Sequence, residues 1–302
     1  MDWLKEIREK YQSQGHDPEI FLQGLFYSRP LTYWDYIEVE TLLSLQHPRT
    51  DFPDEKVFIV YHQAIELFLN LLLHELQQLL NKEEAPPAWR ENKLNRICRY
   101  ADILNSTFKV MNEGMDYDQY NAFRTALAPA SGFQSAQYRQ VEILCTPAWN
   151  LLHPRYKTGG NAVNAYEDFY DKFYWREAGT DPRTGQPGLM LREFDKKYKK
   201  ELLETLKQWQ GKTLCEKAEF WQKAGELTPV MIQKLRELDN IYNVQWPLTH
   251  LQTAEKYLAH QGEEKTSTGA SPWRRYLHPA HQRRIFFPFL WSAEEKENWG
   301  RQ

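Results

Sequence analysis

The window from Val57 to Leu80 is the most apolar stretch of the chain and restricts the fold more than any other feature. It is long enough to cross a bilayer as a helix, but polar side chains recur along it: His62, Glu66, Asn70, His74 and Glu75. That density of polar groups is too high for a simple membrane span. The window therefore predicts a long helix buried in a soluble protein.

Signals of helix ends stand on both sides of this window. Thr32 is followed three residues later by Asp35, a capping pattern that predicts a helix running to His47, where Pro48 disfavours continuation. Asp54 is expected to cap the long apolar helix that follows.

The C-terminal half has a similar pattern. Thr228 followed by Pro229 predicts a helix start, and Pro247 is expected to kink the helix that begins there. Period-2 strand patterns and internal repeats are not found in the sequence. Residues 1–302 are therefore expected to form one large all-α domain. Its other helices are expected at residues 89–112, 117–127, 134–144, 162–175, 191–210 and 214–224.

Composition excludes several classes of function. The 302 residues carry 38 Lys and Arg against 41 Asp and Glu, so a net charge of −3 creates no global field for nucleic acid or an anionic membrane. Cys98, Cys145 and Cys215 lack CxxC or CxxCH spacing, which argues against a disulfide framework and covalent haem attachment. The N-terminal residues show no signal-peptide pattern. We expect a cytoplasmic protein without nucleic-acid or membrane partners.

Two polar residues of the apolar window have two interpretations. His62 and Glu66 are one helical turn apart, so they share a face, and Asn70 extends the ridge. Burying polar groups without partners costs on the order of a few kcal/mol, so the ridge must meet partners, a cavity or water. It is either a hydrogen-bonded core pair or part of a functional site. The ExxH segments that a carboxylate-bridged metal site needs are not seen.

His250 and Arg124 also have a structural and a functional interpretation. His250, in the predicted C-terminal helix, is either a core residue or a ligand of a haem or metal. Arg124, on an otherwise apolar stretch, either reaches towards solvent or binds a carboxylate with its planar fork. Nucleophilic triads, Walker loops and dinucleotide fingerprints are absent from the sequence, so spacing alone does not choose a function.

Four segments in order resemble the tryptophan 2,3-dioxygenase family of b-type haem enzymes. They are "LTYWDYIEVETLLSLQHP", "FIVYHQAIELFLNLLLHEL", "YNAFRTALAPASGFQSAQYRQVE", and "QWPLTHLQTAEKYL" followed by "STGAS" and "FFP". The third is similar to the family's YxxFRxxLxPxSGFQSxQYRxIE and is the most specific. The resemblance runs from about residue 31 to 290 and implies the all-α tryptophan 2,3-dioxygenase or indoleamine 2,3-dioxygenase type of fold.

The resemblance also implies roles for individual residues. It makes His250 the proximal ligand of the iron in haem b, and His62 the distal, catalytic histidine that faces bound oxygen and the indole nitrogen. It places Phe58 against the indole, and Tyr120 and Arg124 beside the carboxylate of the amino acid.

Other implied residues lie near the two ends of the chain. Thr268 falls where the family's loop threonine meets the substrate ammonium. Tyr33, Tyr36 and Ile37 match residues that cap the pocket of a neighbouring subunit in the family's homotetramer. We therefore expect a haem-binding homotetramer in which residues 1–47 pack on or cap a neighbouring copy.

The family reaction inserts both atoms of O2 into the indole ring of L-tryptophan and gives N-formylkynurenine, the entry to the kynurenine pathway of tryptophan catabolism. This chain departs from the family at several positions: its loop reads STGASPW instead of GTGGSSG, and Pro247 lies three residues before the expected ligand. Tyr120 and Arg124 are retained, which implies an amino-acid substrate. A haem monooxygenase of an indole or phenol amino acid in secondary metabolism is the alternative, and a haem-binding sensor is the third hypothesis.

Overall fold

The computed structural model describes residues 2–127, 134–157, 166–181, 183–260, 263–264, 274 and 277–301. The chain divides into two compact units, Met1–His47 and Pro48–Gln302. The first unit consists of short helices: α1 (Trp3–Ser13), α2 (Pro18–Tyr27), α3 (Tyr33–Tyr36) and α4 (Val39–Leu43).

The second unit is built almost entirely of helices. Its α-helices are α5 (Pro53–Asn81), α6 (Pro87–Ser106), α7 (Phe108–Glu113), α8 (Tyr117–Phe123), α9 (Ala136–Cys145), α10 (Pro154–Lys157), α11 (Tyr166–Asp171), α12 (Leu189–Trp209), α13 (Leu214–Lys223), α14 (Pro229–Asn240), α15 (Trp246–Leu258), α17 (Pro279–Gln282) and α18 (Ala293–Glu297). The described residues of this unit also form four 3-10 helices and one π-helix: η1 (Arg124–Leu127), η3 (Ala148–Leu151), η4 (Tyr174–Gly179), η6 (Pro288–Leu290) and the π-helix η5 (Ile241–Gln245).

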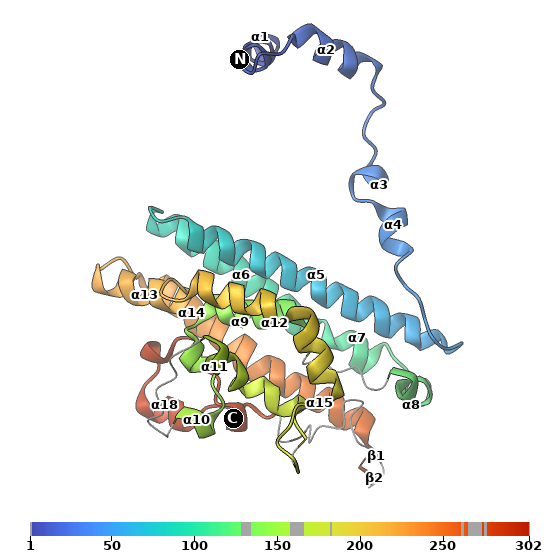
Figure 1. The fold of residues 1–302 in the computed structure, drawn as a ribbon, viewed down its shortest axis with the longest axis vertical. Coiled ribbons are helices and arrows are strands. Elements are labelled where there is room, and N and C mark those ends of the chain that lie inside the picture. The colour runs from blue at the N-terminus through green and yellow to red at the C-terminus, as the bar shows by residue number, and fades with distance from the viewer. Residues whose placement is uncertain are drawn as a thin grey trace. The chain divides into compact units, whose positions relative to one another are not determined.

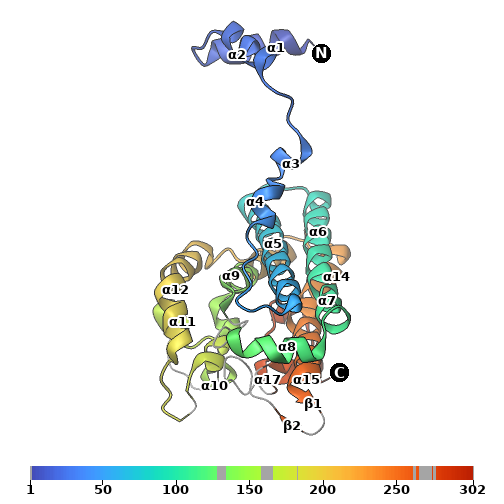
Figure 2. The ribbon, with the colours of Figure 1, turned by 90° about the vertical axis from the view of Figure 1, so that its right-hand side faces the viewer.

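Long helices packed side by side form the core of this unit. α5 lies along α6 and α9, α12 covers α9, and α14 lies on the other side of α6 (Figures 1 and 2). The buried side chains of α5 recur at helical spacing, as expected for a core helix. They include Tyr61, Ile65, Leu69, Leu72, Leu76 and Leu79.

The predicted all-α fold is confirmed. Among the described residues, the only strands are β1 (Ala259–His260) and β2 (Glu263–Glu264), which pair antiparallel over two residues each. Within the same part of the chain, α5 is the one helix long and apolar enough to cross a membrane by those two criteria, which a core helix also meets.

Helix starts agree with the sequence more closely than helix ends. The side chain of Thr32 accepts a hydrogen bond from the backbone of Asp35, and that of Thr228 accepts one from the backbone of Met231, so both N-caps are as predicted. The helix expected from residue 32 to 47 is instead divided, because Glu38 has a positive φ of 52°. The helix expected at residues 89–112 likewise breaks, at Thr107.

Candidate active site

His62 and Phe58 lie one turn apart on α5 and contact each other. Their ring centroids are 4.0 Å apart, and Nδ1 of His62 lies 2.7 Å from the backbone carbonyl oxygen of Phe58. A carbonyl can only accept, so in the neutral ring the proton sits on Nδ1. Nε2 is then the nitrogen with a free lone pair.

The environment of His62 keeps this ring neutral. Burial lowers its pKa from the ordinary 6.5, and this outweighs the opposing effects of the Phe58 carbonyl and the charge on Glu66. The side chain is nevertheless exposed. Neighbouring protein atoms therefore desolvate the ring although water still reaches part of the side chain.

Glu66 and Asn70, which share the ridge with His62, bind one partner. Nε2 of Gln137, on α9, donates to Oε2 of Glu66 at 2.8 Å, and Asn70 donates to the side-chain oxygen of Gln137 at 3.1 Å. These two residues therefore belong to a structural contact between α5 and α9. The contact is partly exposed, so it is not the hydrogen-bonded core pair that one interpretation expected, and Gln137 does not bind His62 in it.

A pair of hydrogen bonds docks α8 onto the start of α5. The backbone N–H of Asp116 donates to Oδ2 of Asp54 at 2.6 Å, and the backbone N–H of Asp54 donates to the side chain of Gln119 at 3.2 Å. Asp54 was expected to cap its own helix, and that prediction is wrong, because Phe52 is the N-cap residue and the Asp54 carboxylate is engaged by α8.

This docking brings Tyr120 and Arg124 towards Phe58. The Tyr120 ring lies 6.2 Å from that of Phe58 and 4.6 Å from that of Tyr257, between centroids. Arg124 follows in η1 and is 9% exposed, so it does not extend into solvent. Burial raises the pKa of Tyr120, whereas the charge and hydrogen bond from Arg124 oppose the rise. A buried guanidinium beside a phenol is suited to a carboxylate.

His250 lies on α15, which is held against the segment between α5 and α8. Its ring is 5.7 Å from that of Phe108 on α7, between centroids. The hydroxyl of Tyr257, two turns further along α15, donates to the backbone carbonyls of Met111 and Met115. Burial, and then the charge on His62, lower the pKa of His250 to about 4, so this imidazole is neutral at pH 7.

The structure thus brings together most of the predicted site residues. Phe58, His62 and Tyr120 are connected by ring contacts, with Arg124 beside Tyr120. His250 is connected to His62 through the rings of Phe108 and Tyr61, which contact the two imidazoles and each other. Within the described ranges, no three His, Cys, Asp or Glu side chains are grouped so that they could hold a metal ion by themselves.

The structure does not test the placement of the remaining predicted residues. Thr268, with the rest of the STGASPW loop, lies outside the described residues. Tyr33, Tyr36 and Ile37 are exposed side chains of the first unit, and their role at a neighbouring subunit stays a prediction.

The sequence did not identify several residues that position the site. Gln137, Gln119 and Tyr257 act through hydrogen bonds to residues far away in sequence, which no local pattern reveals. Phe108 is the ring between His250 and the aromatic residues of α5: its centroid lies 6.2 Å from that of Tyr61.

The fold and the site define a class: an all-helical protein in which two long helices each bring a neutral histidine to a cluster of aromatic rings beside a buried arginine. Comparison with known proteins gives the family. Residues 24–156 match the family model described as tryptophan 2,3-dioxygenase.

Whole-length relatives carry the same name. A tryptophan 2,3-dioxygenase of Ruegeria sp. is 30% identical over 278 residues, which cover 87% of this chain and 91% of that protein. One of Bacillus thuringiensis is 27% identical over 88% of this chain and 92% of its own length. One of Ruegeria pomeroyi is 39% identical, over 44% of this chain and 48% of the relative. The chain therefore belongs to the tryptophan 2,3-dioxygenase family.

Proposed function

We propose that this chain is a haem-dependent dioxygenase that inserts O2 into the indole ring of L-tryptophan or a close analogue, giving N-formylkynurenine. The observation that carries the proposal is the joint placement of His62, His250, Phe58, Tyr120 and Arg124 in one part of the fold. The names of the whole-length relatives support the reaction type, and they favour a dioxygenase over the monooxygenase alternative.

The residues present fit a haem. The porphyrin supplies four nitrogen ligands, so the protein needs to supply one neutral imidazole. His250 meets this requirement, because its pKa of about 4 leaves its lone pair free at pH 7. We assign His250 as the proximal ligand. When bound, the haem supplies the iron at which oxygen is activated.

His62 is assigned to the indole N–H. Its Nδ1 donates to the Phe58 carbonyl, so Nε2 is the acceptor that an indole nitrogen requires. Because burial lowers the pKa of this ring, the acceptor form persists at neutral pH. Phe58, which contacts His62, offers an apolar face against which an indole packs.

Arg124 and Tyr120 are assigned to the amino-acid carboxylate. A guanidinium binds a carboxylate through two parallel charge-assisted bonds, which fixes orientation as well as affinity. Arg124 is buried, so these bonds form with little screening by water. Thr268 is assigned to the substrate ammonium on the sequence resemblance alone.

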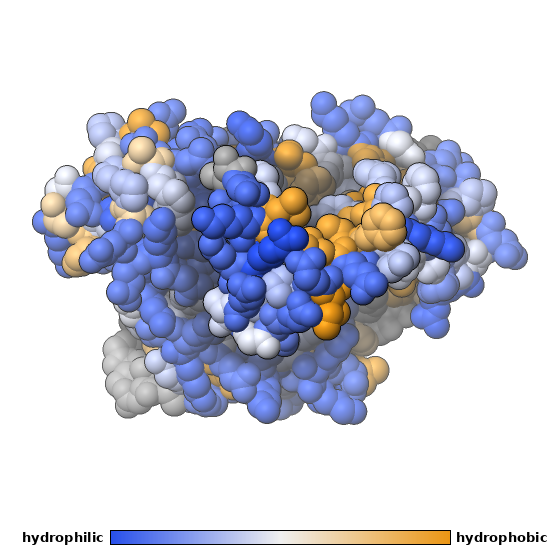
Figure 3. Space-filling view, turned by 90° about the horizontal axis from the view of Figure 1, so that it is seen from above, coloured by the Kyte–Doolittle hydropathy of each residue, from blue (hydrophilic) through white to orange (hydrophobic). Residues whose placement is uncertain are grey.

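The assembly we propose is a cytoplasmic homotetramer in which residues 1–47 cap a neighbouring copy. The first unit exposes a large set of apolar side chains, which fits burial against another protein surface. They include Leu25, Phe26, Tyr27, Leu31, Tyr33, Trp34, Tyr36 and Ile37. α5 adds Val60, Leu67 and Leu71. Figure 3 shows apolar side chains gathered at the surface of the chain among hydrophilic ones.

Reconstitution tests this function. Purified chain is loaded with haemin, reduced, and given L-tryptophan in air, and the product is identified by mass and absorbance. We expect N-formylkynurenine from the wild type and none from His250→Ala, which should fail to retain haem. A haem-loaded wild type that leaves tryptophan and its close analogues unchanged would contradict the proposal.

A further inference from the structure

A proline interrupts the backbone hydrogen bonds just before the helix of His250. In the π-helix η5 the N–H of Trp246 bonds to the carbonyl of Ile241, five residues earlier. The next donor in this register would be residue 247, with the carbonyl of Tyr242 as acceptor. Residue 247 is Pro247, which has no N–H. The carbonyl of Tyr242 must therefore find a donor elsewhere.

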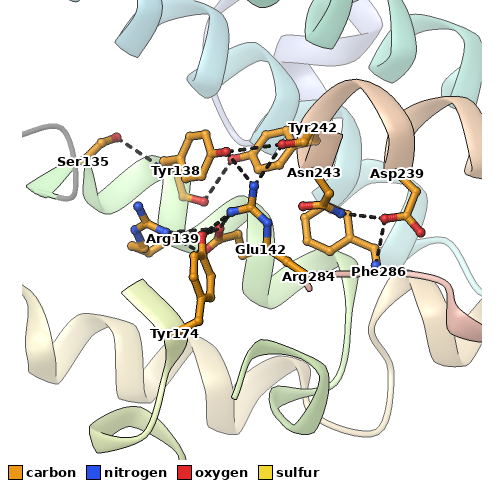
Figure 4. A network of polar contacts seen from close by, with 10 residues as sticks. All are labelled: Ser135, Tyr138, Arg139, Glu142, Tyr174, Asp239, Tyr242, Asn243, Arg284 and Phe286. Atoms are coloured by element: carbon orange, nitrogen blue, oxygen red, sulfur yellow. Dashed lines mark hydrogen bonds and ion pairs between the residues drawn. The ribbon is translucent and has the colours of Figure 1, made fainter. Parts of the chain in front are cut away.

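Two side chains from other parts of the chain supply it. Nη2 of Arg284 donates to the Tyr242 carbonyl oxygen at 3.0 Å, and the hydroxyl of Tyr138 lies 3.5 Å from the same atom (Figure 4). Nη2 of Arg284 also donates to the Tyr138 hydroxyl at 3.1 Å. The rings of Tyr138 and Tyr242 stack with centroids 4.5 Å apart. Tyr242 is 2% exposed, so water is a poor substitute donor.

The guanidinium of Arg284 is itself held in position by buried partners. The residue is 2% exposed, and its Nη1 pairs with the carboxylate of Glu142, which is 1% exposed, and with the hydroxyl of Tyr174. Nη1 of Arg139 bonds to the same carboxylate, so Glu142 serves two guanidinium groups. Burying this charge is costly unless it is paired and hydrogen-bonded, and the Tyr242 carbonyl is one of its hydrogen-bond partners.

The same C-terminal segment holds the other end of the π-helical turn. The carboxylate of Asp239 accepts hydrogen bonds from the backbone N–H groups of Phe286 and Phe287, at 2.9 and 3.1 Å, and from the side chain of Asn243 at 2.6 Å. The segment 284–287 therefore bonds to residues on both sides of the start of the π-helix. Arg284 donates to the Tyr242 carbonyl, and the backbone of Phe286 donates to Asp239 (Figure 4).

The turn determines where His250 lies. α15 starts at Trp246, directly after the turn, and His250 is one helical turn further on. The Trp246 ring lies 6.1 Å from that of Tyr138 and 4.7 Å from that of Phe108, and Phe108 in turn contacts His250. A shift of the turn therefore moves the start of α15, the rings beside it and the imidazole together.

We infer that Arg284 is a positioning residue for His250: it donates the hydrogen bond that Pro247 cannot, and so fixes the turn from which the ligand helix begins. This inference rests on the proposed function, in which His250 holds the haem iron. Arg284 touches neither the haem nor the substrate in this assignment. Its effect is on the orientation of the imidazole.

A double-mutant cycle between residues 284 and 247 tests this role in the full, haem-loaded chain. The readouts are the iron–histidine stretching frequency of the ferrous protein and the rate at which haem is lost to an excess of an acceptor protein. Arg284→Met should shift or broaden the stretching band and speed haem loss about tenfold, because a charged hydrogen bond is lost. Pro247→Ala alone should leave both readouts near those of the wild type.

The combined variant provides the discriminating result. Pro247→Ala restores an N–H that can donate to the Tyr242 carbonyl, so in that background Arg284→Met should change haem loss by no more than about threefold. Arg139→Met is the matched control: it also removes a buried guanidinium from Glu142 and Tyr174, but Nη1 of Arg139 bonds to those side chains rather than to the Tyr242 carbonyl. It should leave the stretching frequency in place.

Two results would overturn the role of Arg284: a stretching band and haem-loss rate in Arg284→Met equal to those in Arg139→Met, or no rescue by Pro247→Ala. If Arg284→Met does not fold, Arg284→Lys replaces it, since an ammonium keeps the charge but lacks the fork that reaches both Glu142 and Tyr242. A shifted band rescued by Pro247→Ala is again expected. Wild-type chain that takes up no haemin would instead refute the proposed function itself.

Discussion

At the scale of single residues, the hydrogen bond between Nδ1 of His62 and the Phe58 carbonyl fixes the tautomer on which the proposed chemistry depends. The acceptor at Nε2 exists only while the ring is neutral. Burial lowers the pKa of His62 below 6.5, so protonation, which removes the acceptor, occurs at a pH lower than for an ordinary histidine.

A pH profile of kcat/KM for the haem-loaded enzyme checks this. We expect kcat/KM to fall on the acidic side with a midpoint below pH 6.5, as His62 takes up a proton. His62→Asn, which cannot titrate, should lose this limb of the profile. An acidic limb centred at or above pH 6.5 in the wild type would show that His62 is not held neutral by burial.

Arg124 allows a second test at this scale. Arg124→Ala should lower kcat/KM for L-tryptophan about a hundredfold, mainly through KM, because about 3 kcal/mol of charge-assisted bonding to the carboxylate is lost. Binding of tryptamine, which has no carboxylate, is the control and should change little. Equal losses for the two ligands would mean that Arg124 supports the fold rather than the carboxylate.

The polar ridge of α5 could not be interpreted from spacing alone. His62, Glu66 and Asn70 formed one polar ridge in the sequence, yet Gln137 binds only the last two. The distinction depends on a helix about seventy positions away along the chain, so spacing within α5 could not reveal it.

At the scale of elements, the docking of α8 on α5 is what places Tyr120 and Arg124. Asp54→Ala removes the acceptor for the backbone N–H of Asp116 and should lower the free energy of unfolding by about 1 kcal/mol. It should also raise KM for tryptophan, because α8 carries Tyr120 and leads directly into Arg124, the two residues that we propose bind the carboxylate. Urea unfolding and steady-state kinetics measure the two effects.

Asp118→Ala is the matched control for Asp54→Ala, because Asp118 is an exposed carboxylate on α8 itself. It should leave both the unfolding midpoint and KM nearly unchanged. If both variants lowered the free energy of unfolding and raised KM equally, the cause would be the loss of a negative charge near the contact of α5 and α8. It would not be the loss of the hydrogen bond between Asp116 and Asp54.

Elements were predictable where their signal is local. The cap at Thr228 followed by Pro229 fixed the start of α14, and the apolar period fixed the core helix α5. Breaks that depend on packing were not predictable: the positive φ at Glu38, the break at Thr107 and the π-helical turn before Pro247. A proline predicts that hydrogen bonding is interrupted, but the partner that compensates for it, Arg284, is known only from the fold.

At the scale of the whole molecule, the number of copies in the assembly is the open prediction. The exposed aromatic and aliphatic residues of the first unit are more than an isolated monomer usually shows to water. Light scattering of the haem-loaded protein should give the mass of four copies of the 36.1 kDa chain. A monomer under the same conditions would remove the role assigned to Tyr33, Tyr36 and Ile37 at a neighbouring site.

The central claim, dioxygenation by a haem held at His250, is tested most directly by the fate of labelled oxygen. Anaerobic, reduced, haem-loaded protein is given L-tryptophan and then 18O2, and the mass of the product is measured. We predict N-formylkynurenine that contains two labelled oxygen atoms. A product with one labelled atom would contradict the claim and establish the monooxygenase instead.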